Sequence, residues 1–221
     1  MAAAAEQEAA ASRLRVSEIF FSIQGESAFS GWPTVFVRLT GCPLRCQYCD
    51  TAYAFTGGQW RTFAEIEAEV RKYGTPYVCV TGGEPLAQPR CAAFLAQLCD
   101  HGFNVSLETS GAIDIADVDQ RVSRVVDLKT PGSREEQRNR WQNLPLLTAH
   151  DAVKIVICDR ADYEWARDVV ARHPVPCPVF FSPSHAQLAP GTLADWIIAD
   201  RLPVRLQVQL HKVLWGNVPG R

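Results

Sequence analysis

The chain has 221 residues, of which 47% are hydrophobic and 21% are charged. This length is typical of one domain that builds its own hydrophobic core. The 22 lysine and arginine residues nearly balance the 24 aspartate and glutamate residues, which argues against binding nucleic acid or an anionic membrane through bulk charge. The sequence has no run of apolar residues long enough to predict a transmembrane helix.

Residues 1–14 are expected to form a frayed or disordered tail, followed by a single domain over residues 15–221. The tail lacks the basic start and the long apolar run of a signal peptide. The chain contains eight cysteines, three of them within eight residues and five scattered through apolar segments. A secreted disulfide scaffold would be shorter and richer in cysteine, so we expect a reducing, cytoplasmic location.

In chain order, the apolar patterning predicts alternating strands and helices. Strands are expected at 16–21, 34–39, 77–80, 104–107, 124–128, 153–157, 178–181 and 205–209. Helices are expected at 63–73, 91–98, 163–172 and 193–199. The polar segment 130–147 is expected to be a long loop carrying a helix. This alternation indicates an α/β fold with a mainly parallel sheet, whose connecting loops would carry the chemistry.

A cysteine cluster directly follows the predicted strand 34–39. Cys42, Cys46 and Cys49 have the spacing C-x3-C-x2-C. Three thiolates can each bind one corner of a 4Fe-4S cluster, and the fourth iron then stays open to a small molecule. Two alternatives remain: a structural zinc ion, which would need a fourth ligand, and a redox C-x2-C pair, which would leave Cys42 without a role.

A second motif, Thr81-Gly82-Gly83-Glu84-Pro85, follows the predicted strand 77–80. Together with the cysteine cluster it resembles the radical S-adenosylmethionine (SAM) superfamily. The resemblance implies a partial (β/α) barrel with about six mainly parallel core strands. It also implies that SAM binds the open iron and that reduction of the cluster yields a 5′-deoxyadenosyl radical.

Three further segments, 21–27, 49–51 and 209–215, resemble the 7-carboxy-7-deazaguanine synthase family. The resemblance implies a carbon–nitrogen lyase of queuosine and 7-deazapurine biosynthesis. Such a lyase converts 6-carboxy-5,6,7,8-tetrahydropterin to 7-carboxy-7-deazaguanine and ammonia, by hydrogen abstraction at C6 and ring contraction. The implied cofactors are a 4Fe-4S cluster, SAM and Mg²⁺. The implied partners are a second copy of the chain in a homodimer and an electron donor such as flavodoxin or ferredoxin.

The same resemblance implies roles for individual residues. Cys42, Cys46 and Cys49 would bind the cluster, and Thr51 would bind magnesium. SAM would be bound by Tyr48, Asp50, Gly82, Gly83, Glu84, Lys129, Ser182 and His185. The pterin would be bound by Ile23, Gln24, Gly25, Glu26, Arg38, Thr81 and His211. No side chain is expected to be catalytic itself, because the radical comes from the cluster and SAM. Segments 128–131 and 182–185 depart from the family pattern.

Several of these residues have structural alternatives. Arg38 could pair with a structural carboxylate, Thr51 could cap a helix, and His211 could be a satisfied core histidine. Segment 108–111 could be a strand-to-turn junction and not a SAM contact. For the whole chain, the rival functions are a radical SAM activase that installs a glycyl radical on a protein, and a non-catalytic iron–sulfur or zinc module.

Overall fold

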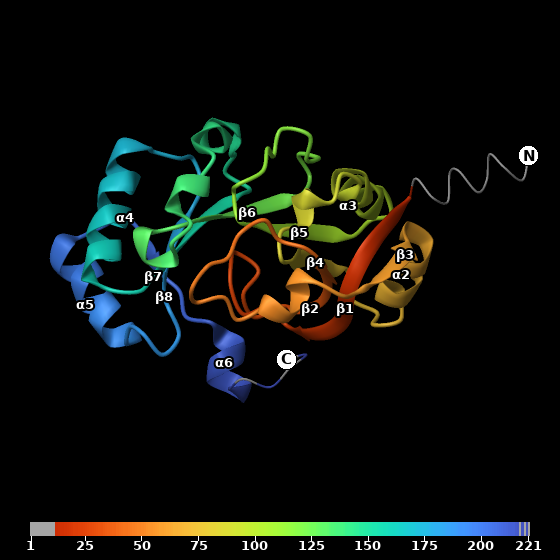
Figure 1. The fold of residues 1–221 in the computed structure, drawn as a ribbon, viewed down its shortest axis with the longest axis horizontal. Coiled ribbons are helices and arrows are strands. Elements are labelled where there is room, and N and C mark those ends of the chain that lie inside the picture. Colours follow the sequence, from red (N-terminus) through yellow and green to blue (C-terminus); the bar gives the residue numbers. More distant parts are fainter. Residues whose placement is uncertain (1–11, 217, 219, 221) are drawn as a thin grey trace, which may run out of the picture.

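A single nine-stranded sheet runs through the molecule (Figure 1). The computed structural model describes residues 12–216, 218 and 220. The strand order is β3-β1-β2-β4-β5-β6-β7-β8-β9. The strands are β1 (Arg13–Ile23), β2 (Pro33–Leu39), β3 (Gln59–Thr62), β4 (Tyr77–Gly82), β5 (Asn104–Thr109), β6 (Ser123–Leu128), β7 (Ala152–Ile157), β8 (Val179–Pro183) and β9 (Arg205–Leu206).

The sheet is parallel from β2 to β9, whereas β1 runs antiparallel to both β2 and β3. β3 and β9 form the two edges and do not pair with each other, so the sheet is an open, partial barrel. This arrangement confirms the expected α/β class and the mainly parallel core. The parallel strands place their carboxyl ends along one edge, which is where sites form in folds of this type.

The helices are α2 (Phe63–Arg71), α3 (Cys91–Asp100), α4 (Arg160–Arg172), α5 (Pro190–Asp200) and α6 (Leu210–Trp215). In Figure 1, α4 and α5 lie beside β7 and β8 at one end of the sheet, and α2 and α3 lie at the other end. α2 starts with a capping box, in which the Thr62 hydroxyl accepts from the amide of Glu65 and the Glu65 carboxylate accepts from the amide of Thr62. No described helix is long and apolar enough to cross a membrane.

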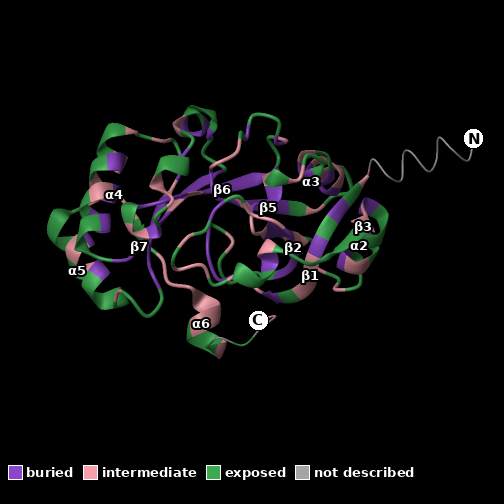
Figure 2. Cartoon of the chain, viewed as in Figure 1, coloured by how far each residue is buried: buried purple, intermediate pink, exposed green. Residues whose placement is uncertain are grey.

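The core follows the central strands, which are coloured as buried in Figure 2. In β4, Val78, Cys79 and Val80 are at most 1% exposed, and in β8 Phe180 and Phe181 are equally buried. Such consecutive apolar residues are typical of parallel strands that are covered on both faces.

The elements differ from the expectations in five places. Segment 130–147 forms three short 3-10 turns, Pro131–Ser133, Glu136–Arg138 and Trp141–Leu146, where an α-helix was expected. Pro145, inside the longest of these turns, lacks the amide hydrogen that a regular helix would need there. The last strand has only two residues, and β3 and α6 were not predicted from the sequence. β1 already begins at Arg13, with Leu14 fully buried, whereas residues 1–11 of the expected tail lie outside the described residues.

Candidate active site

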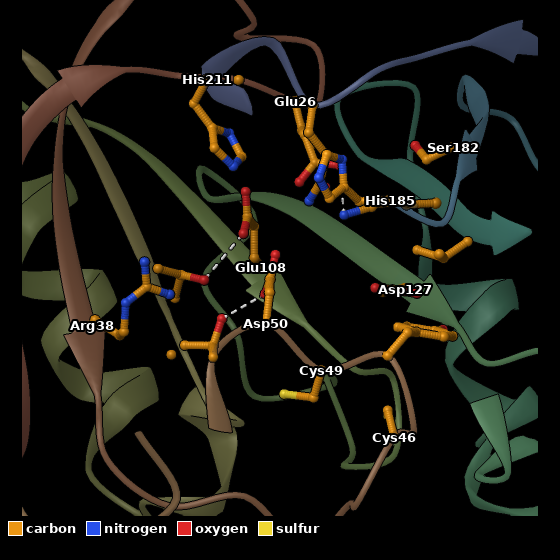
Figure 3. Close-up of a pocket in the computed structure, with 18 of the residues that line it drawn as sticks. Glu26, Arg38, Cys46, Cys49, Asp50, Glu108, Asp127, Ser182, His185 and His211 are labelled. Carbon is orange, nitrogen blue, oxygen red and sulfur yellow. Dashed lines mark hydrogen bonds and ion pairs between the residues drawn. The ribbon is translucent and has the colours of Figure 1, made fainter. Parts of the chain in front are cut away.

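A cavity of about 620 Å³ opens at the carboxyl ends of the parallel strands. Its walls are the β1–β2 loop, the cysteine loop after β2, the ends of β4 to β8, and α6. Every predicted site residue except Glu84 lines this cavity. Figure 3 shows how side chains from these separate segments point toward one another.

The register of β2 and β4 places the two sequence motifs side by side. Leu39 at the end of β2 pairs with Gly82 at the end of β4, so the cysteine loop starts beside the glycine turn. A Cβ on Gly83 would lie 2.8 Å from the Cβ of Cys42. Gly82 has a φ of 146°. Only glycine permits this close approach at these two positions.

The three clustered cysteines are free, half-buried thiols on one loop. Burial raises the pKa of Cys46 to about 11, although the ammonium of Lys129 opposes the rise. No three His, Cys, Asp or Glu side chains in the described part of the chain are arranged to hold one metal ion. A zinc ion would need its ligands around a single centre, whereas an iron–sulfur cube gives each thiolate its own iron. The donor set therefore fits a 4Fe-4S cluster better than zinc.

Polar groups without partners surround the cysteine loop. The Lys129 ammonium lies 3.0 Å from Asp127 and 5.9 Å from the centre of the Tyr48 ring. The Tyr48 hydroxyl, the Oδ1 atom of Asp127 and the Ser182 hydroxyl are buried without a hydrogen-bond partner in the described residues. Because an unsatisfied buried polar group is costly, this cluster suits a polar ligand such as SAM. Asp127 was not predicted, and His185 lines the cavity as an exposed residue of the turn after β8.

Asp50 and Thr51 provide hard oxygen donors at the cavity wall. The Thr51 hydroxyl donates to Oδ1 of Asp50 at 2.8 Å, and the Lys212 ammonium lies 2.8 Å from Oδ2. Burial raises the pKa of Asp50, but the bond and charge of Lys212 outweigh it and hold this pKa well below its usual range. Thr51 makes no side-chain capping bond, so the capping alternative has no support. Carboxylate and hydroxyl oxygens suit magnesium.

Another part of the wall carries a buried carboxylate, Glu26, a partly buried one, Glu108, and a lysine. The Glu108 carboxylate accepts from Gln24 at 3.3 Å and from Thr81 at 3.0 Å. The Lys154 ammonium lies 2.8 Å from Glu26. Burial raises the pKa of Glu108. Burial lowers the pKa of Lys154, but the surrounding carboxylates, led by Glu26, outweigh this and raise it. The sequence-based prediction did not include Glu108 or Lys154 among the site residues, although both line the cavity.

Arg38 is held by a structural carboxylate and still lines the cavity. Its Nε atom donates to Glu18 at 2.6 Å, and the Tyr53 hydroxyl donates to the same Glu18 oxygen at 2.7 Å. The guanidinium carbon lies 5.6 Å from the Phe20 ring centre and 5.9 Å from the Tyr53 ring centre. The Nε group of Arg38 therefore pairs with a structural carboxylate, as the structural alternative expected. Its terminal amino groups make no hydrogen bond within the described residues, so they are available to a ligand.

A C-terminal strap, defined here as residues 207–216, closes over the β1–β2 loop. The Leu210 amide donates to the Gly25 carbonyl at 3.1 Å, and Gln207 and Ser27 exchange two hydrogen bonds of 2.7 and 3.1 Å. A Cβ on Gly25 would lie 2.5 Å from Nδ1 of His211. Burial lowers the pKa of His211. His211 thus lies at the cavity and not in the core.

Glu84 departs from the prediction, because its side chain faces away from the cavity. The fully buried carboxylate accepts from the Thr109 hydroxyl at 2.9 Å, from the Ser110 amide at 2.7 Å and from the Leu86 amide at 3.0 Å. These bonds fasten the turn after β4 to the end of β5. The Glu84 carboxylate is therefore a structural group, and its oxygens are not free to accept from SAM.

Comparison with known proteins gives a consistent result. Residues 36–172 match the model of the radical SAM superfamily. The chain is 45% identical over 208 residues to the 7-carboxy-7-deazaguanine synthase of Chlorobaculum tepidum, covering 92% of this chain and 94% of the relative. It is 43% identical to the corresponding synthase of Koribacter versatilis, covering 91% and 97%. Among solved structures, QueE from Escherichia coli matches with a TM-score of 0.74 at 23% identity, covering 90% and 95% of the two chains, and so shares the fold.

Proposed function

The chain belongs to the 7-carboxy-7-deazaguanine synthase family of the radical SAM superfamily, and on this premise we propose how its cavity performs the family's reaction. The enzyme converts 6-carboxy-5,6,7,8-tetrahydropterin to 7-carboxy-7-deazaguanine and ammonia. One observation supports this proposal. The three clustered thiols, which would hold the cluster, and the wall with Glu26 and Glu108, which would bind the pterin, line the same cavity.

Cys42, Cys46 and Cys49 hold the cluster, beside the glycine turn that gives SAM room to approach. When bound, SAM and the reduced cluster supply the radical that removes the hydrogen atom from C6 of the pterin. Lys129 places positive charge next to the thiolates, and the unpartnered atoms of Tyr48 and Asp127 are suited to polar groups of SAM.

The pterin lies toward the β1–β2 loop. The carboxylates of Glu26 and Glu108 are suited to accept from the N–H groups of the pterin ring. The terminal amino groups of Arg38 bind the substrate carboxylate, since a guanidinium fork matches a carboxylate in shape and charge. His211, on the strap, covers the substrate and helps to exclude water.

Several finer assignments rest on the family resemblance. Magnesium is held by Thr51, with Asp50 beside it, and by oxygens of the substrate and water. The chain acts as a homodimer in the cytoplasm, with a flavodoxin or ferredoxin as electron donor. Residues 15–221 act as one domain.

The test is anaerobic turnover. The protein is reconstituted with iron and sulfide, supplied with dithionite, SAM, magnesium and the carboxylated tetrahydropterin, and the mixture is analysed by mass spectrometry. We expect a product with the mass of the 7-deazapurine acid, lighter than the substrate by one ammonia. Accumulation of 5′-deoxyadenosine without this product would refute the substrate assignment and favour a protein-directed activase. One zinc and no acid-labile sulfide would favour the non-catalytic module.

A further inference from the structure

Three lysines line the cavity, and each forms an ion pair with a different carboxylate. Lys129 pairs with Asp127 beside the cysteine loop. Lys212 pairs with Asp50 next to the magnesium-binding hydroxyl. Lys154 pairs with Glu26 and is therefore the lysine on the pterin side.

Lys154 is fixed in a ring of carboxylates. It extends from β7, where it pairs in register with Asp127 of β6. Its side chain is 13% exposed, and that of Glu26 is 11% exposed. Glu108 and Asp127 add negative charge from β5 and β6, and Figure 3 shows Glu26, Glu108 and Asp127 around this part of the cavity. A buried ammonium in such surroundings stays protonated at neutral pH.

The proposed reaction, on which this inference rests, needs an acid. In the substrate C6 is bonded to N5, whereas in the product the carboxylated carbon is bonded to the pyrimidine ring and N5 is gone. After ring contraction, the C6–N bond must break with its electron pair on nitrogen. A proton leaves C7, the C6–C7 double bond forms, and the nitrogen takes up one proton to depart as ammonia. This elimination is redox-neutral.

We propose that Lys154 is the catalytic acid that protonates the departing amine, and that Glu26 returns the proton to it. Glu26, 2.8 Å from the ammonium, accepts the proton that leaves C7 and passes it to the neutral Lys154 amine. The pair thus ends the elimination in its starting protonation state.

The other cations of the cavity are less suited to this step. A guanidinium does not release its proton in proteins, so Arg38 serves as an anchor and not as an acid. Lys129 lies beside the cluster-binding thiols, and Lys212 is bonded to Asp50. Lys154 alone among these cations carries a proton that it can donate and forms an ion pair with a predicted pterin ligand, Glu26.

The experiment separates hydrogen abstraction from ammonia release. Wild type, Lys154→Arg and Lys154→Met are given substrate deuterated at C6. Deuterium transfer into SAM and 5′-deoxyadenosine is measured together with ammonia and product. For Lys154→Arg, which keeps the charge but is a poor proton donor, we expect deuterium transfer within about threefold of wild type and ammonia release about 100-fold slower, a typical loss for a missing general acid. Lys154→Met should lose at least as much ammonia release. A species with the mass of the substrate should accumulate.

Three outcomes would overturn the inference. Ammonia release by Lys154→Arg within threefold of wild type would mean that only the charge of Lys154 matters. Equal losses of deuterium transfer and ammonia release would mean that Lys154 only positions the pterin. If neither variant folds with its full iron content, single-turnover ammonia release by wild type is compared in light and heavy water. The release should slow in heavy water, and equal rates refute an acid-dependent step.

A matched control is Lys72→Arg, at a side chain that is 71% exposed on the surface beside α2. Lys72→Arg should leave deuterium transfer and ammonia release unchanged. If wild type itself forms no 7-deazapurine acid, the proposed function fails. If wild type and Lys154→Arg form it equally fast, only the role of Lys154 fails.

Discussion

Replacing Glu84 with glutamine should destabilise the protein and leave SAM binding nearly intact. The carboxylate accepts from two backbone amides, Leu86 and Ser110, and from the Thr109 and Ser110 hydroxyls. In Glu84→Gln one oxygen becomes an NH2 group, which faces at least one of these donors. A hydrogen bond to a charged group contributes about 1.5–3 kcal/mol, and an unsatisfied buried donor costs about 1–3 kcal/mol. We therefore expect the free energy of unfolding to fall by about 3 kcal/mol.

The assay is thermal unfolding, followed by SAM binding below the transition. For a chain of this length a loss of about 3 kcal/mol lowers Tm by roughly 6–12 °C. Glu164→Gln, at a half-exposed helix surface pair, is the matched control and should shift Tm little. The Kd for SAM should stay within about threefold, since the side chain does not reach the cavity. An unchanged Tm with SAM binding weakened tenfold or more would refute this reasoning and make the Glu84 carboxylate a SAM ligand.

The remaining predictions concern the cavity itself. Cys46→Ala should lose the cluster and all SAM cleavage, measured as iron content and 5′-deoxyadenosine, whereas Cys99→Ala, away from the cavity, should keep both; a cluster retained by Cys46→Ala would contradict its role as a ligand. Thr51→Ala should still bind SAM and lose stimulation by magnesium; an unchanged magnesium dependence of turnover would rule out the metal-ligand role. Arg38→Lys should raise KM for the carboxylated pterin by about 10- to 100-fold, because one ammonium cannot serve both Glu18 and the substrate carboxylate. Equal weakening of SAM binding by Arg38→Lys would show that Arg38 is structural.

The fold was predictable where local pattern and tertiary packing agree. The parallel strands were found because consecutive apolar residues such as Val78, Cys79 and Val80 match burial on both faces. β3 was missed because it has only four residues, Gln59–Thr62, and none of them is buried. β3 forms through edge pairing with the β1 backbone, which no side-chain pattern reports.

α6 was missed for a related reason. It has no buried residue and no capping side chain, and the strap that contains it is held by bonds from Leu210 and Gln207 to a loop near the start of the chain. Such long-range bonds leave no periodicity in the sequence.

The residues that line the cavity were predictable where they lie in motifs and hidden where they lie inside strands. Glu108, Asp127 and Lys154 belong to β5, β6 and β7, whose apolar neighbours dominated the sequence interpretation. A signal was available, because a charged side chain within a buried strand must be paired or must serve a ligand. Glu84 is the opposite case, because it was predicted as a SAM ligand from its motif alone. The motif could not show that the Glu84 carboxylate already accepts hydrogen bonds from Thr109 and Ser110 at the end of β5.

The strap also determines the order in which the two halves of the cavity can be completed. The cysteine loop is buttressed by the neighbouring glycine turn, through a bond from the Glu84 amide to the Gly41 carbonyl. The pterin side is closed by Ser27 and Gln207, which are 180 residues apart. Contacts between distant residues require a larger loss of chain entropy and form late in folding. The cysteine loop can therefore form its contact with the glycine turn while the strap is still undocked, whereas the pterin side closes only when Gln207 reaches the β1–β2 loop.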